Sequence, residues 1–350
     1  MNMRLLWSLV MVLVVGVVAS CGDSGSTPPA GGASGGGGKM KVGLLVVGST
    51  SDGGWNQQAK DALDKLAASE NLDVRVRQQV GKDGAADAIR QFDSQGYALV
   101  IAHGYEYLEA AKELSDPSKG NAVKVKIAVS GGDVDNPNFQ SLEYDLSGAS
   151  YQLGIVAAKV SKSGKLGFIG GAKFPTVLAM QRGFQAGAKS VNPSVTFAEA
   201  WPGWDDPSKA KREAEAFISQ GVDVIMQDVD AASRGVFEAV KENNAKPFTA
   251  PRTVVYTFGA NSDQNANPVC PDYTLASAVI KMDLAFGGAV KQVKDGSFKG
   301  GIVKEGIASG VSVAVLNPKL TGKVIDAETQ KQVDEAAKKL ASGDITIPRE

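Results

Sequence analysis

Histidine is almost absent from this sequence, because His103 is the only one among 350 residues. Metal sites built from histidine clusters, and catalysis by Ser-His-Asp or Cys-His groups, therefore have almost no residues to draw on. An excess of positive charge is lacking too, since 37 lysines and arginines balance 38 aspartates and glutamates. Nucleic-acid-binding proteins normally carry a basic patch, so this balance argues against that class.

Cysteine is scarce, and the two cysteines have different surroundings. Cys21 follows small residues at the end of an apolar run, residues 5–18, that is short for a membrane span of about 20 residues. This pattern resembles the lipobox of bacterial lipoproteins, so we expect residues 1–20 to be a signal peptide and Cys21 to carry a lipid. The alternative is an uncleaved membrane anchor. Cys270 is then a lone thiol, which we expect to be passive.

Glycine, serine and proline dominate residues 21–39. A segment without apolar periodicity cannot bury enough surface to fold. We therefore expect a flexible tether between a lipid on Cys21 and a folded body that lies at the cell membrane, outside the cytoplasm.

From residue 40 onward, short apolar runs alternate with amphipathic stretches. The apolar runs predict strands at 42–47, 74–79, 98–102, 125–129, 165–169, 195–200, 222–226 and 254–258. The amphipathic stretches predict helices at 55–68, 85–95, 105–114, 177–190, 207–220 and 234–243. Alternation of strand and helix predicts an α/β protein with parallel sheets covered by helices on both faces.

The pattern also repeats within the chain. Residues 41–45 match residues 165–169, and residues 92–96 match residues 217–221, at nearly the same offset. Two such matches in 350 residues indicate a tandem of two similar lobes, each a doubly wound parallel sheet. Ligands bind at the carboxyl ends of such strands, so two facing lobes would form a clamp that closes by hinge motion.

The loop after the first strand suits a planar, polar ligand. Asp52 and Asn56 offer hydrogen bonds for the edges of such a ligand, and Trp55 offers a ring for stacking. Two structural roles fit the local sequence equally well: Asp52 as a helix N-cap, and Trp55 as a core residue.

A second loop, residues 201–207, contains two tryptophans, although loops favour small polar residues. We expect one of them, Trp204, to face the cleft and to hold a ligand ring together with Trp55. A third loop after a strand, residues 258–264, contributes Asn261 as a polar ligand contact.

Three further residues complete the predicted site. His103 ends a strand at the expected cleft, where a ligand contact and a satisfied structural histidine are both compatible with the sequence. We also expect Phe174 and Asp230 to contact the ligand. We expect no metal site, no cofactor and no catalytic residue.

Five short motifs are spread over nearly all of the chain behind the lipobox. They are Asp52-Gly53-Gly54-Trp55-Asn56, Gly170-Gly171, Gly183 to Ala188, Gly203 to Pro207 and Gly259 to Gln264. Each motif is weak alone, but their order and spacing are similar to those of the basic membrane protein family. These are the purine nucleoside receptor A-like lipoproteins of ABC importers.

The resemblance implies a type I periplasmic-binding-protein fold with several hinge crossings between two lobes. We assign residues 40–146 and about 277–303 to the N-terminal lobe, and residues 147–276 and about 304–350 to the C-terminal lobe. The resemblance also implies a purine nucleoside clamped between aromatic rings. The expected partners are the small-molecule ligand, the ABC permease and ATPase subunits, and the membrane through the N-terminal lipid.

Four positions carry over from the family. Asp52 matches an aspartate that contacts the base, and Asn56 matches an asparagine. Trp55 stands where phenylalanine is usual, and Trp204 falls where an aromatic residue is common.

Two positions depart from the family. Asn261 stands where nucleoside binders usually carry an aspartate for the ribose. Ile280 aligns with their lysine, while Lys281 lies one residue later, about 100° away on a helix. The loss of both groups suggests an altered ribose site, and a free nucleobase or another ligand of similar size.

Other functions remain compatible with parts of the sequence. A sugar or another small polar solute would suit the same rings and polar groups, for transport or for sensing. An enzyme is disfavoured, because the one obvious carboxylate pair, Asp133 and Asp135, has the sequence of a turn and nothing marks it for acid–base work.

Overall fold

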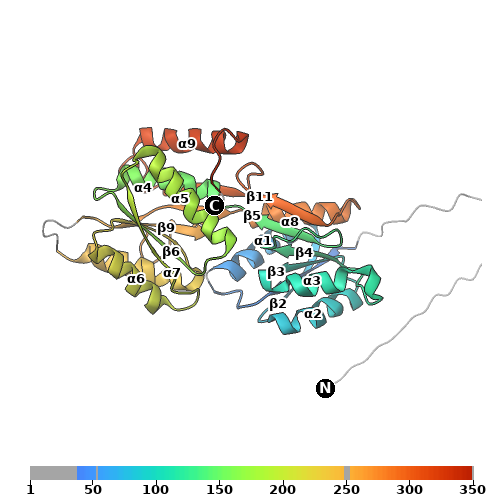
Figure 1. Ribbon diagram of the computed structural model, residues 1–350. Helices are drawn as coiled ribbons and strands as arrows, with labels where there is room; N and C mark the ends of the chain where they lie inside the picture. The colour runs from blue at the N-terminus through green and yellow to red at the C-terminus, as the bar shows by residue number, and fades with distance from the viewer. Residues whose placement is uncertain (1–37, 53, 248–252, 349–350) are drawn as a thin grey trace, which may run out of the picture. The chain divides into compact units, whose positions relative to one another are not determined.

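The computed structural model describes residues 38–52, 54–247 and 253–348, so the predicted signal peptide and lipidation site lie outside the described residues. The described chain forms two sheets of six strands, each covered by helices (Figure 1). None of the helices in this part of the chain has the length and apolarity needed to span a bilayer.

The first sheet has the order β11-β5-β4-β3-β1-β2, and all its strands are parallel. The interior strand β1, between β3 and β2, is almost continuously apolar, as expected for a parallel strand covered on both faces. The strands are β1 Met40–Val46, β2 Leu72–Arg77, β3 Leu99–His103, β4 Lys126–Ser130, β5 Gln140–Tyr144 and β11 Gly301–Glu305.

The second sheet has the order β12-β10-β9-β8-β6-β7 and repeats this arrangement. Its strands are parallel except for the edge strand β12, which runs antiparallel to β10. The strands are β6 Lys165–Gly170, β7 Thr196–Ala200, β8 Val224–Asp228, β9 Tyr256–Asn261, β10 Thr274–Ile280 and β12 Ser312–Leu316.

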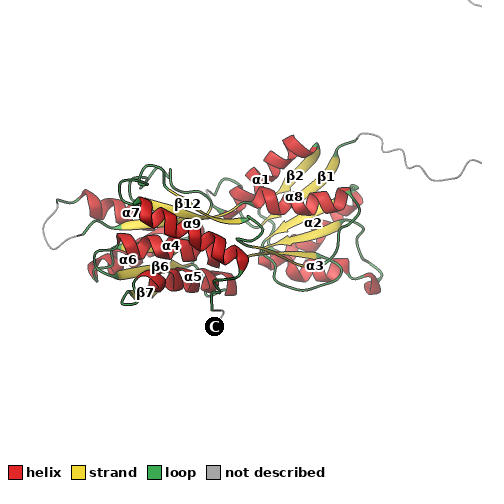
Figure 2. Cartoon of the chain, turned by 90° about the horizontal axis from the view of Figure 1, so that it is seen from above, coloured by secondary structure: helices red, strands yellow, loops and turns green. Residues whose placement is uncertain are grey.

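Helices cover both faces of both sheets. On one face, α1 and α8 cover the first sheet and α4, α5 and α9 cover the second; one apolar core runs beneath them, with α9 beside α4 (Figure 2). On the other face, α2 and α3 enclose a separate core, as do α6 and α7. The helices are α1 Trp55–Glu70, α2 Lys82–Ser94, α3 Leu108–Ser115, α4 Ser147–Val160, α5 Pro175–Val191, α6 Pro207–Ser219, α7 Ser233–Ala245, α8 Met282–Lys294 and α9 Ala327–Ser342.

These layers confirm the predicted fold of two doubly wound lobes, which we call the first and second lobe after their sheets. The internal repeat has a packing cause. Phe92 lies on Gly43 in the first lobe and Phe217 on Gly167 in the second; a methyl group on these glycines would approach the rings to 2.9 and 2.6 Å. In both lobes the lysine two residues before the glycine donates to the carbonyl at the end of the covering helix, at 3.1 and 2.9 Å.

The chain crosses between the lobes three times: at residues 145–146, at Lys281 and at residues 306–311. The crossings are bonded to their neighbours. The Asp145 N–H donates to the Glu305 carbonyl at 2.8 Å, and the Lys281 N–H donates to the Val311 carbonyl at 2.7 Å. Three adjacent crossings form a hinge of the kind that the type I fold uses.

The sheets divide at places slightly different from the expected ones. We expected boundaries near residues 277 and 303, but residue 277 lies inside β10 of the second sheet and residue 303 inside β11 of the first. Several elements of the structure were not predicted: β5, β10, β11, β12, α4, α8 and α9.

Candidate functional site

The loop between β1 and α1 is organised by Asp52. Its carboxylate accepts hydrogen bonds from the backbone N–H groups of Gly54, Asn56 and Gln57 at 2.9–3.2 Å, and from the Asn56 side-chain amide at 2.7 Å. The start of a helix leaves such N–H groups without partners. The N-cap residue of α1 is Gly54, so Asp52 is not itself the N-cap; it caps the helix from two residues earlier, with both carboxylate oxygens occupied. The Asn56 amide oxygen is buried and has no hydrogen-bond partner in the described part of the chain.

Trp55 begins α1 and is half-buried. Its ring stacks on the His103 imidazole, with ring centroids 4.1 Å apart and 22° between the planes. Tyr144 meets the Trp55 ring edge-on at 5.9 Å. An indole that is held by two neighbouring rings and keeps part of its surface exposed is suited to stack on a planar ligand.

His103 supports Trp55 from a fully buried position. Its Nε2 lies 3.1 Å from the Trp55 carbonyl oxygen and must donate, because a carbonyl only accepts. Its Nδ1 then accepts from the Ser130 hydroxyl at 2.8 Å, and the Tyr144 hydroxyl donates to Ser130 at 2.9 Å. Burial lowers the pKa of His103 to about 3, so the imidazole is neutral. With both ring nitrogens occupied, His103 offers no polar atom to a ligand in this structure, which is the structural role that the sequence left open.

Two tryptophans of the second lobe, Trp201 and Trp204, are half-buried and pack against the core. Trp201 packs on Phe168, with ring centroids 5.9 Å apart. Trp204 lies against the backbone after β6, where a methyl group on Gly171 would come within 2.2 Å of its ring. Phe174 stacks beside Trp204 at 6.1 Å and is 53% exposed. The ligand sandwich between Trp55 and Trp204 stays a prediction, because the described ring contacts join each of them to other residues.

A polar cluster lies at the carboxyl ends of β8 and β9. The Asn261 side-chain amide donates to Asp228 at 3.0 Å and lies 3.4 Å from an oxygen of Asp230. Asp230 and Asn261 have φ angles of +43° and +63°, in the left-handed region that asparagine and aspartate tolerate better than most residues. The two strand ends thereby place two carboxylates around one amide.

Both carboxylates of this cluster have raised pKa values. Burial raises the pKa of Asp228 to about 6. Burial is also the main cause for Asp230, and the negative charges of Asp228, Asp52 and Asp205 add to it, which brings the pKa of Asp230 to about 7. A site of this kind favours ligand groups that donate hydrogen bonds over groups that carry negative charge.

The Trp55 loop and this polar cluster are in contact across the two lobes. The Gln58 side-chain amide on α1 donates to the carbonyl oxygens of Asn261 at 2.5 Å and Ile280 at 2.7 Å. Asp230 faces Gly54, since a methyl group on that glycine would lie 3.9 Å from it. The structure therefore brings Asp52, Trp55, Asn56, Asp230 and Asn261 into one region, with His103 behind it.

Two residues of this region were not predicted. Asp228 was missed because the expected strand ended at Met226, whereas β8 continues to Asp228. With the true strand end, the rule that ligands meet the carboxyl ends of parallel strands would have selected it. Gln58 was missed because its partners are backbone carbonyls more than 200 residues away, for which the sequence contains no signal.

Replacing Asp230 by asparagine should stabilise the protein at pH 8. A pKa that is raised on folding means that ionisation costs more in the folded than in the unfolded chain. The Asp230 contribution to the free energy of unfolding therefore falls as the pH rises from about 4 to about 7. Since Asp230 keeps partial exposure, we expect a gain of about 1–2 kcal/mol, less than the full shift would give. Denaturant unfolding at pH 8 and near pH 4 measures the gain and its disappearance.

The control for this prediction is Asp295→Asn. Hydrogen bonds from Lys291 and Ser297 lower the pKa of Asp295 to about 2, so its charge is favourable and its removal should not stabilise the protein at pH 8. An Asp230→Asn variant no more stable than the unaltered protein at pH 8 would contradict the assigned cost of the buried charge.

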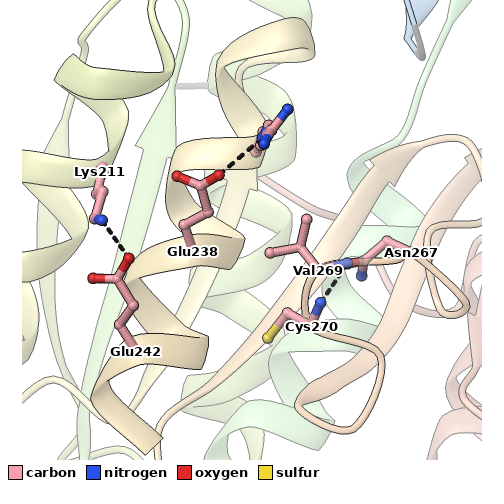
Figure 3. Close-up of polar contacts among 7 residues, drawn as sticks. Lys211, Glu238, Glu242, Asn267, Val269 and Cys270 are labelled. Carbon is pink, nitrogen blue, oxygen red and sulfur yellow. Dashed lines mark hydrogen bonds and ion pairs between the residues drawn. The ribbon is translucent and has the colours of Figure 1, made fainter. Parts of the chain in front are cut away.

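Cys270 lies away from this region, in the loop between β9 and β10. Asn267 accepts hydrogen bonds from the N–H groups of Val269 and Cys270 at 3.1 and 2.7 Å, which closes the turn that holds the sulfur (Figure 3). Burial raises the pKa of the thiol to about 12. Cys270 therefore has the setting of a passive thiol, as expected. Within the described ranges, no group of three or more His, Cys, Asp or Glu side chains is placed to hold a metal ion.

Known proteins resemble this chain over nearly its whole described length. Residues 39–350 match a family model described as ABC transporter substrate-binding protein PnrA-like. An ABC transporter nucleoside-binding protein of Lactococcus lactis subsp. cremoris is 27% identical over 85% of this chain and 86% of its own. A purine-binding protein of Brucella abortus is 27% identical over 78% of this chain and 74% of its own.

A solved structure agrees with these relatives. A solute-binding protein of an ABC transporter system from Conexibacter woesei superimposes with a TM-score of 0.71 and 25% identity, covering 89% of this chain and 99% of that one. The family predicted from the five motifs is confirmed: the chain belongs to the PnrA-like family of ABC transporter substrate-binding proteins.

Proposed function

We propose that this protein captures a purine nucleoside or a nucleobase-like solute outside the cytoplasm and delivers it to an ABC importer. The observation that supports this most is the meeting of two unlike surfaces. The Trp55 ring and the start of α1 come from the first lobe, and the cluster of Asp228, Asp230 and Asn261 comes from the second. Gln58 joins them, because its side chain on α1 donates to the Asn261 carbonyl oxygen.

Each surface suits one part of a purine compound. The Trp55 ring is a platform for the flat base, because every base has an aromatic face that can stack on an indole. Asp228 and Asp230 accept hydrogen bonds from N–H groups of a base or from hydroxyl groups of a sugar. Asn261 stands between them, and because its NH2 group donates to both carboxylates, its amide oxygen is the atom that it offers to a ligand, as an acceptor. The nucleoside-binding and purine-binding relatives support this choice of ligand.

The remaining predicted residues receive roles that follow from their contacts. Asp52 holds the start of α1 and the Asn56 amide in place, and the free oxygen of Asn56 accepts from the ligand. Trp204 and the exposed ring of Phe174 cover the ligand from the second lobe. His103 fixes the Trp55 platform.

The proposal includes anchoring and partners. Cys21 carries the lipid after removal of residues 1–20, and residues 21–39 tether the folded body to the membrane. Closing of the lobes on the ligand presents one shape to the permease and ATPase subunits, because only the closed form contacts the ligand from both sides. The protein binds and releases its ligand unchanged, without a cofactor and without catalysis.

A sugar or another small polar solute is the second candidate. A carboxylate pair beside an aromatic ring also suits the hydroxyl groups and the apolar face of a pyranose, and Asn261 replaces the aspartate expected for ribose.

A thermal-shift screen of residues 39–350 against nucleosides, free nucleobases and common sugars tests the function. A ligand that binds only the folded state adds about 2.7 kcal/mol at a hundredfold excess over Kd. A shift with adenosine, guanosine or inosine supports nucleoside binding. A shift only with bases or only with sugars changes the cargo to that class, and no shift in the whole screen contradicts the proposed ligand.

A further inference from the structure

At the proposed site, the Gln58 side-chain amide on α1 of the first lobe donates hydrogen bonds to two backbone carbonyl groups of the second lobe. We propose that Gln58 is an interlobe latch, a positioning residue that holds Asn261, and through it the two carboxylates, in register with the Trp55 loop. The proposal rests on the proposed function for the identity of the ligand, but not for the latch itself.

The position of Gln58 explains its reach. It lies three residues after Trp55, nearly one turn along α1, and therefore close to the same face of the helix. Both of its partners, the carbonyl oxygens of Asn261 and Ile280, can only accept hydrogen bonds. The NH2 group must therefore point toward them, because the reverse orientation would place three oxygens together.

The two carbonyl groups belong to different parts of the second lobe. Asn261 ends β9 with a left-handed backbone, and its side chain donates to Asp228. Ile280 ends β10, directly before the crossing at Lys281. One amide thus ties α1 of the first lobe to the polar cluster and to the hinge at the same time.

Hydrogen bonds act only at short range. A rotation that moves α1 from β9 by more than about 1 Å breaks the bond to Asn261. The latch therefore stabilises the arrangement in which both halves of the site can touch one ligand, and it raises the population of that arrangement before the ligand arrives. It should slow ligand release more than it speeds capture, since differences among variants of one site appear mainly in the dissociation rate.

Two substitutions distinguish hydrogen bonding by the Gln58 amide from simple packing of its side chain. Gln58→Met keeps an unbranched side chain of similar length but removes both donors. Gln58→Lys keeps donors, three on its ammonium group, beside an acidic cluster. Gln332→Met on α9 is the matched control, because the Gln332 amide donates to Glu328 on its own helix and does not cross between lobes.

Amide hydrogen exchange of the ligand-free protein is the first test. With Gln58→Met, we expect faster exchange in β9, at the end of β10 and in the first turn of α1, and unchanged exchange in α9. Gln58→Lys and Gln332→Met should resemble the unaltered protein. Equal acceleration by Met and Lys at position 58 would mean that packing matters and not the donors. No acceleration by either would mean that the bonds restrain nothing, and both outcomes overturn the latch. If Gln58→Met unfolds the whole chain, Gln58→Lys decides: normal exchange supports the latch, and the same unfolding overturns it.

Ligand release is the second test. We would follow tryptophan fluorescence after dilution of complexes with adenosine, inosine or adenine. Dissociation should be about tenfold faster for Gln58→Met, as expected for one or two lost hydrogen bonds, with association changed less than threefold. Unchanged dissociation would contradict the latch. If the unaltered protein binds none of these probes, the proposed ligand is wrong, while the exchange experiment still decides the latch.

Discussion

Replacing Gly187 by alanine should cost the protein about 3 kcal/mol or more of unfolding free energy, because the added methyl group has no space. Gly187 lies on α5 against the buried helix α4, and its Cβ would stand 1.9 Å from the Tyr151 carbonyl oxygen. Backbone atoms cannot turn aside as a flexible side chain can, so α5 must move away from α4. A melting temperature lower by roughly 6–12 °C is expected for a domain of this size.

Gly288→Ala is the matched control. Gly288 is exposed on α8, and a methyl group there would meet no atom within 4 Å. Alanine should instead stabilise this helix by about 0.5–1 kcal/mol. If Gly187→Ala melts at the temperature of Gly288→Ala, close packing of α4 and α5 cannot be the reason for glycine in the motif from Gly183 to Ala188.

Replacing Trp55 by alanine should weaken ligand binding by roughly 10- to 100-fold, or about 1–3 kcal/mol, while the protein still folds. The variant loses the stacking platform and leaves the His103 ring without its cover. Calorimetric titration with the best ligand of the thermal-shift screen measures the affinity, and the ligand-free melting temperature shows whether folding is intact.

Trp55→Phe tests whether an aromatic ring at this position is sufficient for binding. It keeps an aromatic face, so we expect affinity within a few-fold of the unaltered protein. If Trp55→Ala instead unfolds the protein, or lowers stability while affinity is retained, Trp55 is a core residue and the platform must be assigned elsewhere.

The sequence by itself determined the fold and the family. Apolar runs and amphipathic stretches are local patterns, and their alternation led to the right class of sheet and to most elements around β1 and β6. The repeat of residues 92–96 at 217–221 indicated two similar lobes, and the structure shows that Phe92 and Phe217 pack on equivalent glycines. Five short motifs were sufficient to identify the family.

Two of the elements that were not predicted, α4 and β5, lack a local pattern in the sequence. Helix α4 is buried on nearly all sides, so it has no polar face and no amphipathic period to recognise. Strand β5 carries polar residues that the tertiary structure buries, such as Gln140, which bonds to Gln292 on α8. For these segments, burial depends on neighbours that lie far away in the sequence.

The contacts within the candidate site also depend on residues that lie far apart in the sequence. The sequence predicted that Asp52, Trp55, Asn56 and Asn261 follow strands. In the structure Asp52 lies in the loop after β1, Trp55 and Asn56 begin α1, and Asn261 is the last residue of β9. Only the tertiary structure decided that Asp52 caps α1, that His103 lies behind Trp55, and that Gln58 reaches Asn261 across the lobes. The physical reason is that periodicity records which face of an element is buried, whereas a hydrogen bond or a ring stack depends on where two distant segments meet.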